Sequence, residues 1–212
     1  MINYRNMAKA AWCTVSPMSG KENAPISITV PAYTGRLARN TTVTVTNKNG
    51  TKPSKAITAN QAGAGNTLTL DSTKPDVLST GGTVTINGTS NSAKLKWSVI
   101  LTIAGIEALF DRSTTVKVNN TAISNNTAIN GDPGASAKYN FIATIVLDAS
   151  PFPVDVLVTF KIEDGTGNSK VCTFTWKAGA STLSVDKSAL NFAATGGTQN
   201  VNVTSNDEWT VS

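Results

Sequence analysis

The stretches Thr67-Leu-Thr-Leu-Asp71 and Thr182-Leu-Ser-Val-Asp186 decide the fold, because they are one motif that occurs twice, 115 residues apart. The same offset places Thr80-Gly-Gly-Thr83 on Thr195-Gly-Gly-Thr198, and Thr89-Ser-Asn91 on Thr204-Ser-Asn206. A separate block agrees, since Val43-Thr44 and Ser54-Lys55 fall on Val158-Thr159 and Ser169-Lys170. Two independent blocks with one offset indicate an internal repeat of domain size.

The repeat divides the 212 residues into one complete copy and two partial copies. Residues 64–179 form the complete copy, which lies between Gln61-Ala-Gly63 and Lys177-Ala-Gly179. Residues 1–63 contain the closing half of a copy, and residues 180–212 contain the opening half of the next one. Copies of about 115 residues have the usual size of a small domain.

Each copy has the pattern of short antiparallel strands. Val43 and Val45 alternate with threonines, which is the period of a half-buried strand. Asn49-Gly50 and Asp164-Gly165 predict hairpin turns, and Gly81-Gly82 predicts a tight turn or bulge. We therefore predict an all-β chain of tandem immunoglobulin-like β-sandwich domains. Only Ile100–Arg112 favours a helix. It lies within Ile100–Asn126, which we interpret as an insertion that the first copy lacks.

The composition argues against catalysis and against metal binding. The chain has no histidine, which excludes His-based triads and His-ligated metal sites. The acidic residues fall mostly in turns, with no sign of the paired carboxylates that glycosidases use. Glu163–Asn168 resembles a calcium loop, but its repeat partner is Lys48-Asn49-Gly50-Thr51, which favours a hairpin turn. We expect a non-enzyme without cofactors or metals.

Two further features concern the compartment. Cys13 and Cys172 are far apart and lack metal-ligand spacing, so we expect buried free thiols, with Cys172 facing inward beside Phe174 and Trp176. The sequence contains neither the apolar core of a signal peptide nor a membrane-spanning stretch. We therefore expect a soluble protein that stays where it is made, unless a leader has been removed.

The repeats resemble BACON domains, an immunoglobulin-like β-sandwich module of Bacteroidetes and their phages. The opening half carries the resemblance in Leu183-Ser-Val-Asp-Lys187, Val201–Asn206 and Trp209-Thr-Val-Ser212. The closing half carries it in Trp12, Ile28-Thr-Val30 and Arg39–Val45. BACON modules are commonly proposed to bind carbohydrate or mucin, so the resemblance implies a binding role.

A leaderless, basic string of such domains also resembles the decoration proteins of crAss-like Bacteroides phages. This resemblance implies an auxiliary structural protein on the virion surface, assembled in the host cytoplasm. Its partners would be the major capsid protein and other virion proteins, with host or mucin glycans as further contacts. The alternative is a carbohydrate-binding module of a Bacteroidetes surface or periplasmic protein.

Three tryptophans, Trp12, Trp97 and Trp209, stand at what we interpret as one repeated motif position. Each could stack on a sugar ring, which makes them the candidate glycan-binding residues. Buried aromatic residues are usual in immunoglobulin-like sandwiches, and a position present in every copy favours a core role. We therefore expect core packing for these indoles and for Trp176.

Basic residues gather in the first half-domain, within a chain whose net charge is +5. The cluster consists of Arg36, Arg39, Lys48, Lys52 and Lys55. Lysines of this kind also protect sheet edges from pairing. We expect docking onto an acidic capsid lattice rather than binding to nucleic acid, and we expect no membrane contact.

Neither half-domain can pair all its strand edges or bury its apolar face alone. Three arrangements are open. In the first, the chain continues beyond Ser212. In the others, residues 180–212 complete residues 12–63, either of the same chain or of a neighbouring chain, which would build a homo-oligomer. We expect a distal or foreign strand beside the open edge of residues 12–63.

Overall fold

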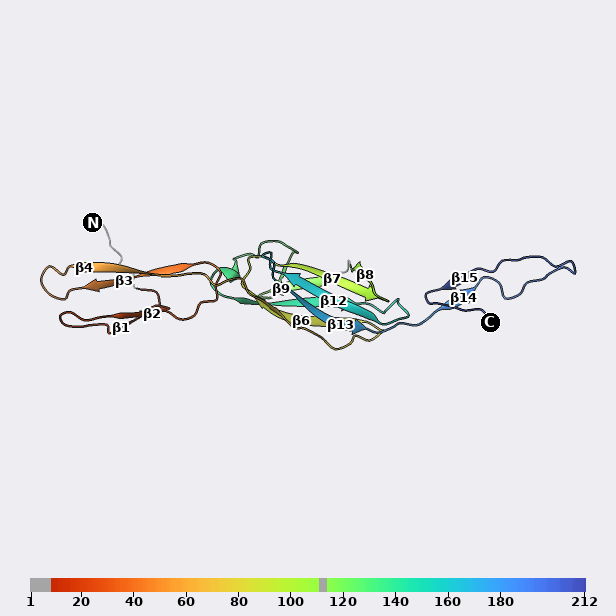
Figure 1. Ribbon diagram of the computed structural model, residues 1–212, viewed down its shortest axis with the longest axis horizontal. Helices are drawn as coiled ribbons and strands as arrows, with labels where there is room; N and C mark the ends of the chain where they lie inside the picture. The colour runs from red at the N-terminus through yellow and green to blue at the C-terminus, as the bar shows by residue number, and fades with distance from the viewer. Residues whose placement is uncertain (1–8, 111–113) are drawn as a thin grey trace.

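The computed structural model describes residues 9–110 and 114–212. These residues form β-strands and a 3₁₀ turn at Pro133–Ala135, so the predicted all-β class is confirmed. We call residues 9–63 the head, residues 64–179 the middle domain and residues 180–212 the tail. The head and the tail lie at opposite ends of the middle domain, so the molecule is elongated (Figure 1).

Two facing sheets build the middle domain. One has the strand order β10-β9-β11-β6-β5, and the other has the order β13-β12-β7-β8. This arrangement is that of an immunoglobulin-like sandwich. The strands are β5 (Leu68–Leu70), β6 (Gly82–Ser90), β7 (Lys96–Ile103), β8 (Ile106–Leu109), β9 (Thr114–Val118), β10 (Thr121–Ile123), β11 (Tyr139–Leu147), β12 (Val156–Glu163) and β13 (Ser169–Trp176).

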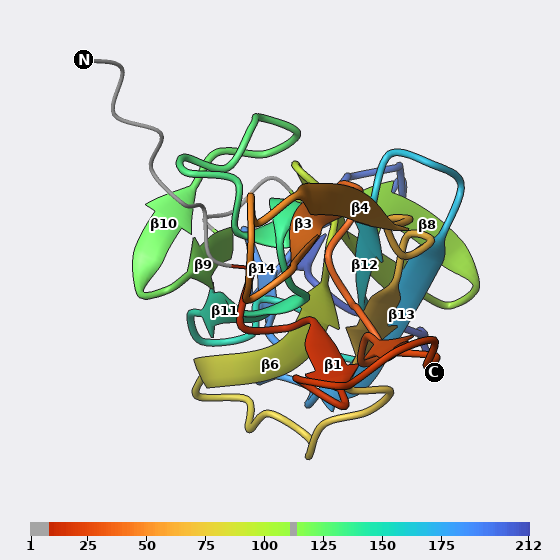
Figure 2. The same ribbon diagram turned by 90° about the vertical axis from the view of Figure 1, so that its left-hand side faces the viewer.

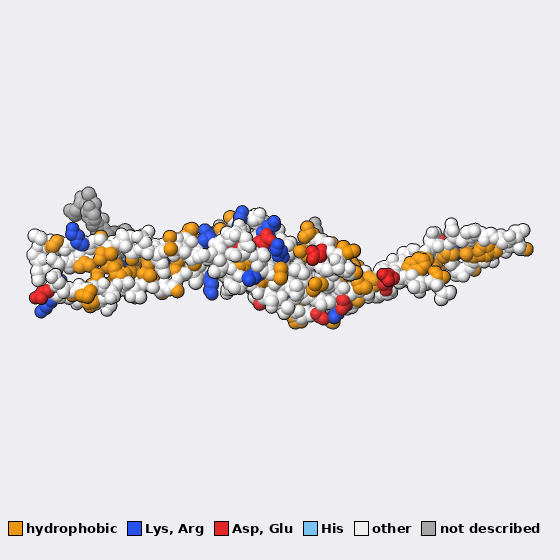
Figure 3. Space-filling model, in the orientation of Figure 1, with side chains coloured by type: hydrophobic (Ala, Val, Ile, Leu, Met, Phe, Trp, Pro, Cys, Tyr) orange, Lys and Arg blue, Asp and Glu red, His pale blue; other side chains and the backbone are white. Residues whose placement is uncertain are grey.

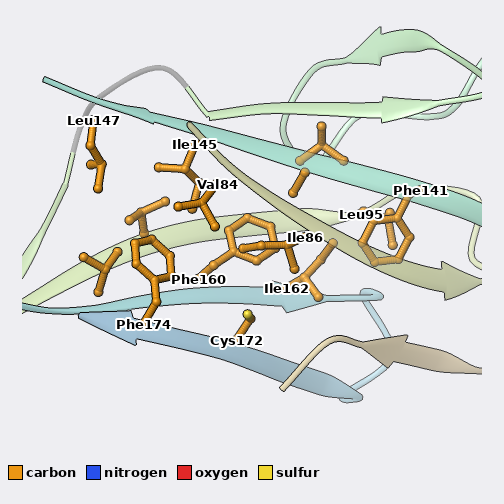
Figure 4. Packing of buried hydrophobic residues seen from close by; sticks show 14 of the residues in the cluster. Val84, Ile86, Leu95, Phe141, Ile145, Leu147, Phe160, Ile162, Cys172 and Phe174 are labelled. Carbon is orange, nitrogen blue, oxygen red and sulfur yellow. The ribbon is translucent and has the colours of Figure 1, made fainter. Parts of the chain in front are cut away.

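Alternating side chains of both sheets fill the core between them (Figure 4). β12 buries every second residue from Val156 to Ile162, and each of these four side chains is fully buried. Opposite them, β6 and β11 contribute Ile86 and Phe141. Cys172 points into this core as a buried free thiol, as predicted, and burial raises its pKa.

The predicted helix at Ile100–Arg112 is wrong. The described part of this stretch belongs to the antiparallel hairpin β7–β8, which turns at Ala104 and Gly105, while Arg112 lies outside the described residues. Both turn residues have positive φ, 47° and 82°, as the type I′ turn of a two-residue hairpin requires. Cross-strand pairing therefore overrode the weak helical spacing of the apolar residues.

The head contains two separate hairpins. β1 (Thr14–Ser16) pairs with β2 (Ser27–Thr29), and β3 (Arg39–Thr46) pairs with β4 (Ser54–Gln61) around the predicted Asn49-Gly50 turn. Viewed along the axis, β1 and the β3–β4 hairpin lie on opposite sides of it (Figure 2). The head thus has the two layers of a sandwich, each with only two strands.

The hairpins of the head match strands of the middle domain in register. The 115-residue offset places β4 on β13 and β2 within β11. Val15 of β1 lies opposite Ile28, just as Val116 of β9 lies opposite Ala143, the counterpart of Ile28. β1 therefore takes the place of β9, which lies inside the stretch that we interpreted as an insertion.

The tail is a single hairpin in which β14 (Leu183–Val185) pairs with β15 (Val203–Ser205). The carboxylate of Asp186 accepts hydrogen bonds from the backbone and side-chain nitrogens of Asn202 at 2.8 and 2.7 Å. Asp71 and Asn87 make the same pair of bonds in the middle domain. No described residue of the tail pairs with the head, so completion within one chain is wrong.

Hydrogen bonds join the head to the middle domain. Asn91 is fully buried, and its side-chain nitrogen donates to the carbonyls of Thr34 and Gly65, both at 3.1 Å. The backbone nitrogens of Arg36 and Leu37 donate to Gly134 and Ala135 at 2.8 and 3.0 Å. A buried polar group held on several sides fixes the orientation of the two units.

Candidate binding surfaces

An aromatic and cationic cluster forms at the end of the head that faces the middle domain. The guanidinium carbon of Arg39 lies 4.2 Å from the ring centre of Trp12 and 4.0 Å from that of Tyr33, which is cation–π geometry. The Nε of Arg39 donates to the side-chain oxygen of Gln61 at 2.9 Å, across the β3–β4 pair. We call these four residues the Trp12 cluster.

Local structure holds each member of the Trp12 cluster in place. Arg39 and Gln61 are directly opposite each other where β3 begins and β4 ends. The Tyr33 hydroxyl donates to the carbonyl of Ala135 at 3.1 Å, which anchors this ring to the middle domain. All four residues are only half-buried, so part of the cluster is exposed to solvent. The cluster can therefore contact a ligand that combines apolar faces with hydroxyl groups.

Arg36 lies in the joint rather than on an open basic surface. Its guanidinium forms an ion pair with Asp132 at 2.5 Å and donates to the carbonyl of Asn91 at 3.3 Å. Its side chain is 24% exposed. Arg36 and Arg39 thus have structural partners, and the predicted basic cluster is divided.

The three lysines of the predicted cluster lie at the other end of the head. Lys48 and Lys52 are in the β3–β4 turn, and Lys55 is in the first part of β4. All three are exposed, at the end of the elongated molecule (Figure 1). An eight-residue strand, about 25 Å long, separates this turn from Arg39.

The candidate tryptophans occupy different environments. Trp97 is in β7 and packs, half-buried, against the core, whereas Trp209 is 51% exposed in the tail. Trp12 precedes β1, which pairs with β2, while β7 pairs with β8 and β12. Trp12 and Trp97 therefore do not share one position in the fold. Trp176 is buried, as predicted, with Phe110 and Phe152 edge-on at 6.2 and 5.9 Å.

The Glu163–Asn168 segment is a hairpin turn, as predicted, and its acidic residue is buried. Asp164 accepts hydrogen bonds from Asn168 and Thr166 at 2.7 to 2.8 Å. Burial raises the pKa of Asp164, but these hydrogen bonds outweigh it and hold the pKa below its usual value. Within residues 9–110 and 114–212, no three potential metal-ligating side chains gather at one place.

Two open hollows lie on the surface of the middle domain and beside the tail. One, of about 590 Å³, lies between residues 66–69 and 167–170 and has mainly polar side chains. The other, of about 450 Å³, lies between the apolar residues Ile103 and Phe152–Val154 and residues 205–208 of the tail. The titratable residues that line them are Lys170 in the first and Asp207 and Glu208 in the second.

Sequence reasoning missed Tyr33, Gln61 and Asn91. Asn91 had a signal in the sequence, because it belongs to the repeated Thr-Ser-Asn motif. Its counterpart Asn206 makes similar hydrogen bonds, accepting from the Thr182 nitrogen and donating to the Ala180 carbonyl. Tyr33 and Gln61 belong to no chemical motif. Strand register places Gln61 opposite Arg39, whereas Tyr33 reaches Arg39 from the connection between β2 and β3.

Comparisons with known proteins give one family match, over the head. No curated protein matches the chain. Among the described residues, no helix has the length and hydropathy to cross a bilayer. Residues 3–62 match the BACON family, described as "Putative binding domain, N-terminal". The head, with its Trp12 cluster, is thus similar to a family of binding domains.

Proposed function

We propose that this chain is a non-enzymatic binding protein in which immunoglobulin-like units form a rod with a carbohydrate-binding head. The Trp12 cluster is the observation that carries the proposal. It lies within the residues that match a family of binding domains. The joint around Asn91 supports the rod, because its buried hydrogen bonds hold the head at a set angle to the middle domain.

Carbohydrate is the ligand class that suits the Trp12 cluster. A sugar ring has apolar C–H faces that can lie on an indole and hydroxyls that accept and donate hydrogen bonds. Arg39 holds the Trp12 ring in place and adds N–H donors beside it. Gln61 fixes the guanidinium, so that the platform is ordered before a ligand arrives.

The test compares binding of soluble mucin and of a panel of mucin oligosaccharides by wild type and Trp12→Ala. We expect the variant to lose about tenfold or more in affinity while its thermal unfolding changes little. Trp12→Phe should recover part of the binding. Trp209→Ala, which removes an equally large exposed indole from the tail, should bind like wild type. Equal binding by Trp12→Ala and wild type would refute the carbohydrate proposal.

A second function, docking onto an acidic capsid lattice as a virion decoration protein, draws support from the lysines of the β3–β4 turn. Lys48, Lys52 and Lys55 are exposed at one end of the rod, where end-on contact would leave the remaining domains projecting. Attraction between such lysines and an acidic surface weakens as salt is added.

Co-sedimentation with phage particles from a Bacteroides lysate tests this second function over a range of NaCl concentrations. We expect wild type to sediment with the particles at low salt and to be released at high salt. Replacement of all three lysines by Glu should abolish co-sedimentation, whereas Lys138→Glu and Lys170→Glu in the middle domain should not. Equal sedimentation of the triple variant would exclude the turn as the docking site.

A further inference from the structure

The head exposes apolar residues at positions that are buried in the middle domain. Val45 and Ile57 are 46% and 40% exposed, whereas their repeat counterparts Phe160 and Cys172 are fully buried. Val43 and Ile57 are directly opposite each other in the β3–β4 pair, so this face continues across both strands. The β3–β4 hairpin thus presents the inner face of a sandwich in which each layer has only two strands.

The tail has the same property. Leu183 and Val201 are 66% and 38% exposed, whereas their counterparts Leu68 and Ile86 are 7% and 0% exposed. Val211 is 84% exposed. It corresponds to Val99 when Trp209 is aligned with Trp97. Hydrophobic side chains form a band along the tail and a patch over the head (Figure 3).

The unpaired strand edges of the head and the tail are complementary. β2 pairs only with β1, and β15 pairs only with β14, within the described residues. In the middle domain, β11 corresponds to β2 and β6 corresponds to β15. β11 and β6 pair with each other over nine residue pairs. The edge that is unpaired in the head is therefore the edge that the tail sequence pairs with in a complete copy.

We propose that the tail of one molecule completes the head of a second copy of this chain. β15 adds beside β2 to give the sheet β1-β2-β15-β14, and residues 209–212 add beside β3. The completed unit has the two-layer arrangement of the middle domain. This inference is independent of the proposed carbohydrate binding, because it concerns strand edges and not the Trp12 cluster.

The register of the middle domain transfers directly to the proposed contact. Ala143 lies opposite Ile86 and Phe141 opposite Gly88, so Ile28 should lie opposite Val201 and Ile26 opposite Val203. Phe160 lies opposite Val99, which places Val45 opposite Val211. Every one of these pairs is apolar on both sides.

Side-chain sizes in the two halves also match. A Cβ on Gly88 would lie 2.1 Å from Cζ of Phe141, so the middle domain combines the smallest residue with a large ring. The counterparts are Val203 in the tail and Ile26 in the head. Val203 is larger than Gly88, and Ile26 is smaller than Phe141, so the two differences in side-chain volume act in opposite directions and the fit is conserved.

Charge favours a second copy as the occupant. The head has seven basic residues and one acidic residue, Glu22, whereas the tail has three acidic residues and one basic residue, Lys187. Head-to-head and tail-to-tail contacts would bring like charges together. Because the head and the tail lie at opposite ends, each contact leaves one head and one tail unpaired, so copies add in a line.

Sedimentation velocity of the whole 212-residue chain, between about 1 and 100 µM, tests the proposal. We expect assemblies that grow with concentration. Val45→Lys in the head and Val201→Lys in the tail should each weaken association at least about 100-fold, because a lysine would be buried without a partner. Both positions are exposed in the single chain, so these variants should fold.

Matched controls place a lysine on the opposite face of β3 in the head and of β15 in the tail. Thr44→Lys and Thr204→Lys are exposed neighbours on the outer face and should assemble like wild type. An equimolar mixture of Val45→Lys and Val201→Lys has one intact head and one intact tail, so it should form dimers and nothing larger. A monomeric wild type, assemblies that persist in both lysine variants, or a mixture that stays monomeric would each overturn the proposal.

A cysteine pair tests the register. Thr144 lies opposite Thr85, so Thr29→Cys and Asn200→Cys should face each other between copies on the outer side. Mild oxidation of the doubly substituted chain should give a ladder of covalent multimers. Thr29→Cys with Thr204→Cys, which is four residues out of register, should give none. Equal cross-linking of both pairs would contradict the assigned register.

Discussion

Asp164 shows how a single residue stabilises the closing hairpin of the middle domain. Its carboxylate is 2% exposed and accepts hydrogen bonds from the Thr166 backbone nitrogen, the Thr166 hydroxyl and the Asn168 side chain. The backbone nitrogen of Asp164 in turn donates to the carbonyl of Asn168 at 3.1 Å. The acid therefore orders a turn whose glycines, Gly165 and Gly167, have positive φ.

We expect Asp164→Asn to destabilise the middle domain by about 1–3 kcal/mol at neutral pH, because buried donors lose their charged acceptor. The folded-state pKa of Asp164 is lowered, so its stabilisation is complete above the unfolded pKa of about 4 and is lost as pH falls through the folded value. Urea unfolding at pH 7 and pH 3 measures this. The variant should lose less stability in acid than wild type.

Asp155→Asn is the control, since Asp155 is an exposed carboxylate that pairs with Lys177. Asp155→Asn should lower the free energy of unfolding at pH 7 much less than Asp164→Asn does. An equal loss in the two variants would show that surface charge, and not the buried turn, explains the effect.

Strand pairing at the element scale depends on a close approach between β6 and β11. Gly88 lies opposite Phe141 in this pair, and an added Cβ would meet both the Phe141 ring and the backbone oxygen of Thr69, at 2.1 and 2.6 Å. The glycine therefore allows the ring to fill the core where two strands flank β6.

Gly88→Ala should destabilise the middle domain by about 1–3 kcal/mol through overpacking. Phe141→Leu alone should also destabilise it, by leaving a cavity. The double variant should cost clearly less than the two single changes together, because the smaller side chain makes room for the added methyl. Chemical denaturation of all four proteins closes the cycle, and additive costs would show that the two sites do not interact.

At the scale of the whole molecule, the joint between head and middle domain determines whether the protein is a rod. Asn91 binds residues of both units, since its Oδ1 accepts from the Thr67 nitrogen at 2.9 Å while its Nδ2 donates to Thr34 and Gly65. Arg36 adds the ion pair with Asp132. These contacts turn a short connection into an ordered interface.

We expect Asn91→Ala to loosen this joint. Small-angle X-ray scattering should show a wider distribution of dimensions, and the segment around residues 31–37 should be cleaved faster by a protease. Asn206→Ala, at the repeat counterpart in the tail, should leave the rate of cleavage around residues 31–37 unchanged. Unaltered scattering and cleavage of Asn91→Ala would mean that the other contacts hold the joint without it.

The sequence alone determined the β class, the 115-residue repeat and the hairpin turns, because period-2 alternation and Asn-Gly or Asp-Gly pairs are local signals. It also predicted the inward Cys172. Ile100–Arg112 misled us, since apolar spacing over a few residues cannot separate a helix from paired strands.

Only the tertiary structure decided which side chains meet. Arg36 and Arg39 belong to one basic run in the sequence, yet one pairs with Asp132 and the other stacks on Trp12 and Tyr33. Likewise, the repeat revealed that two half-domains exist, whereas the strand order showed that β2 and β15 keep unpaired edges within the described residues. Contacts between residues far apart in the chain depend on strand order and register, which local sequence patterns do not encode.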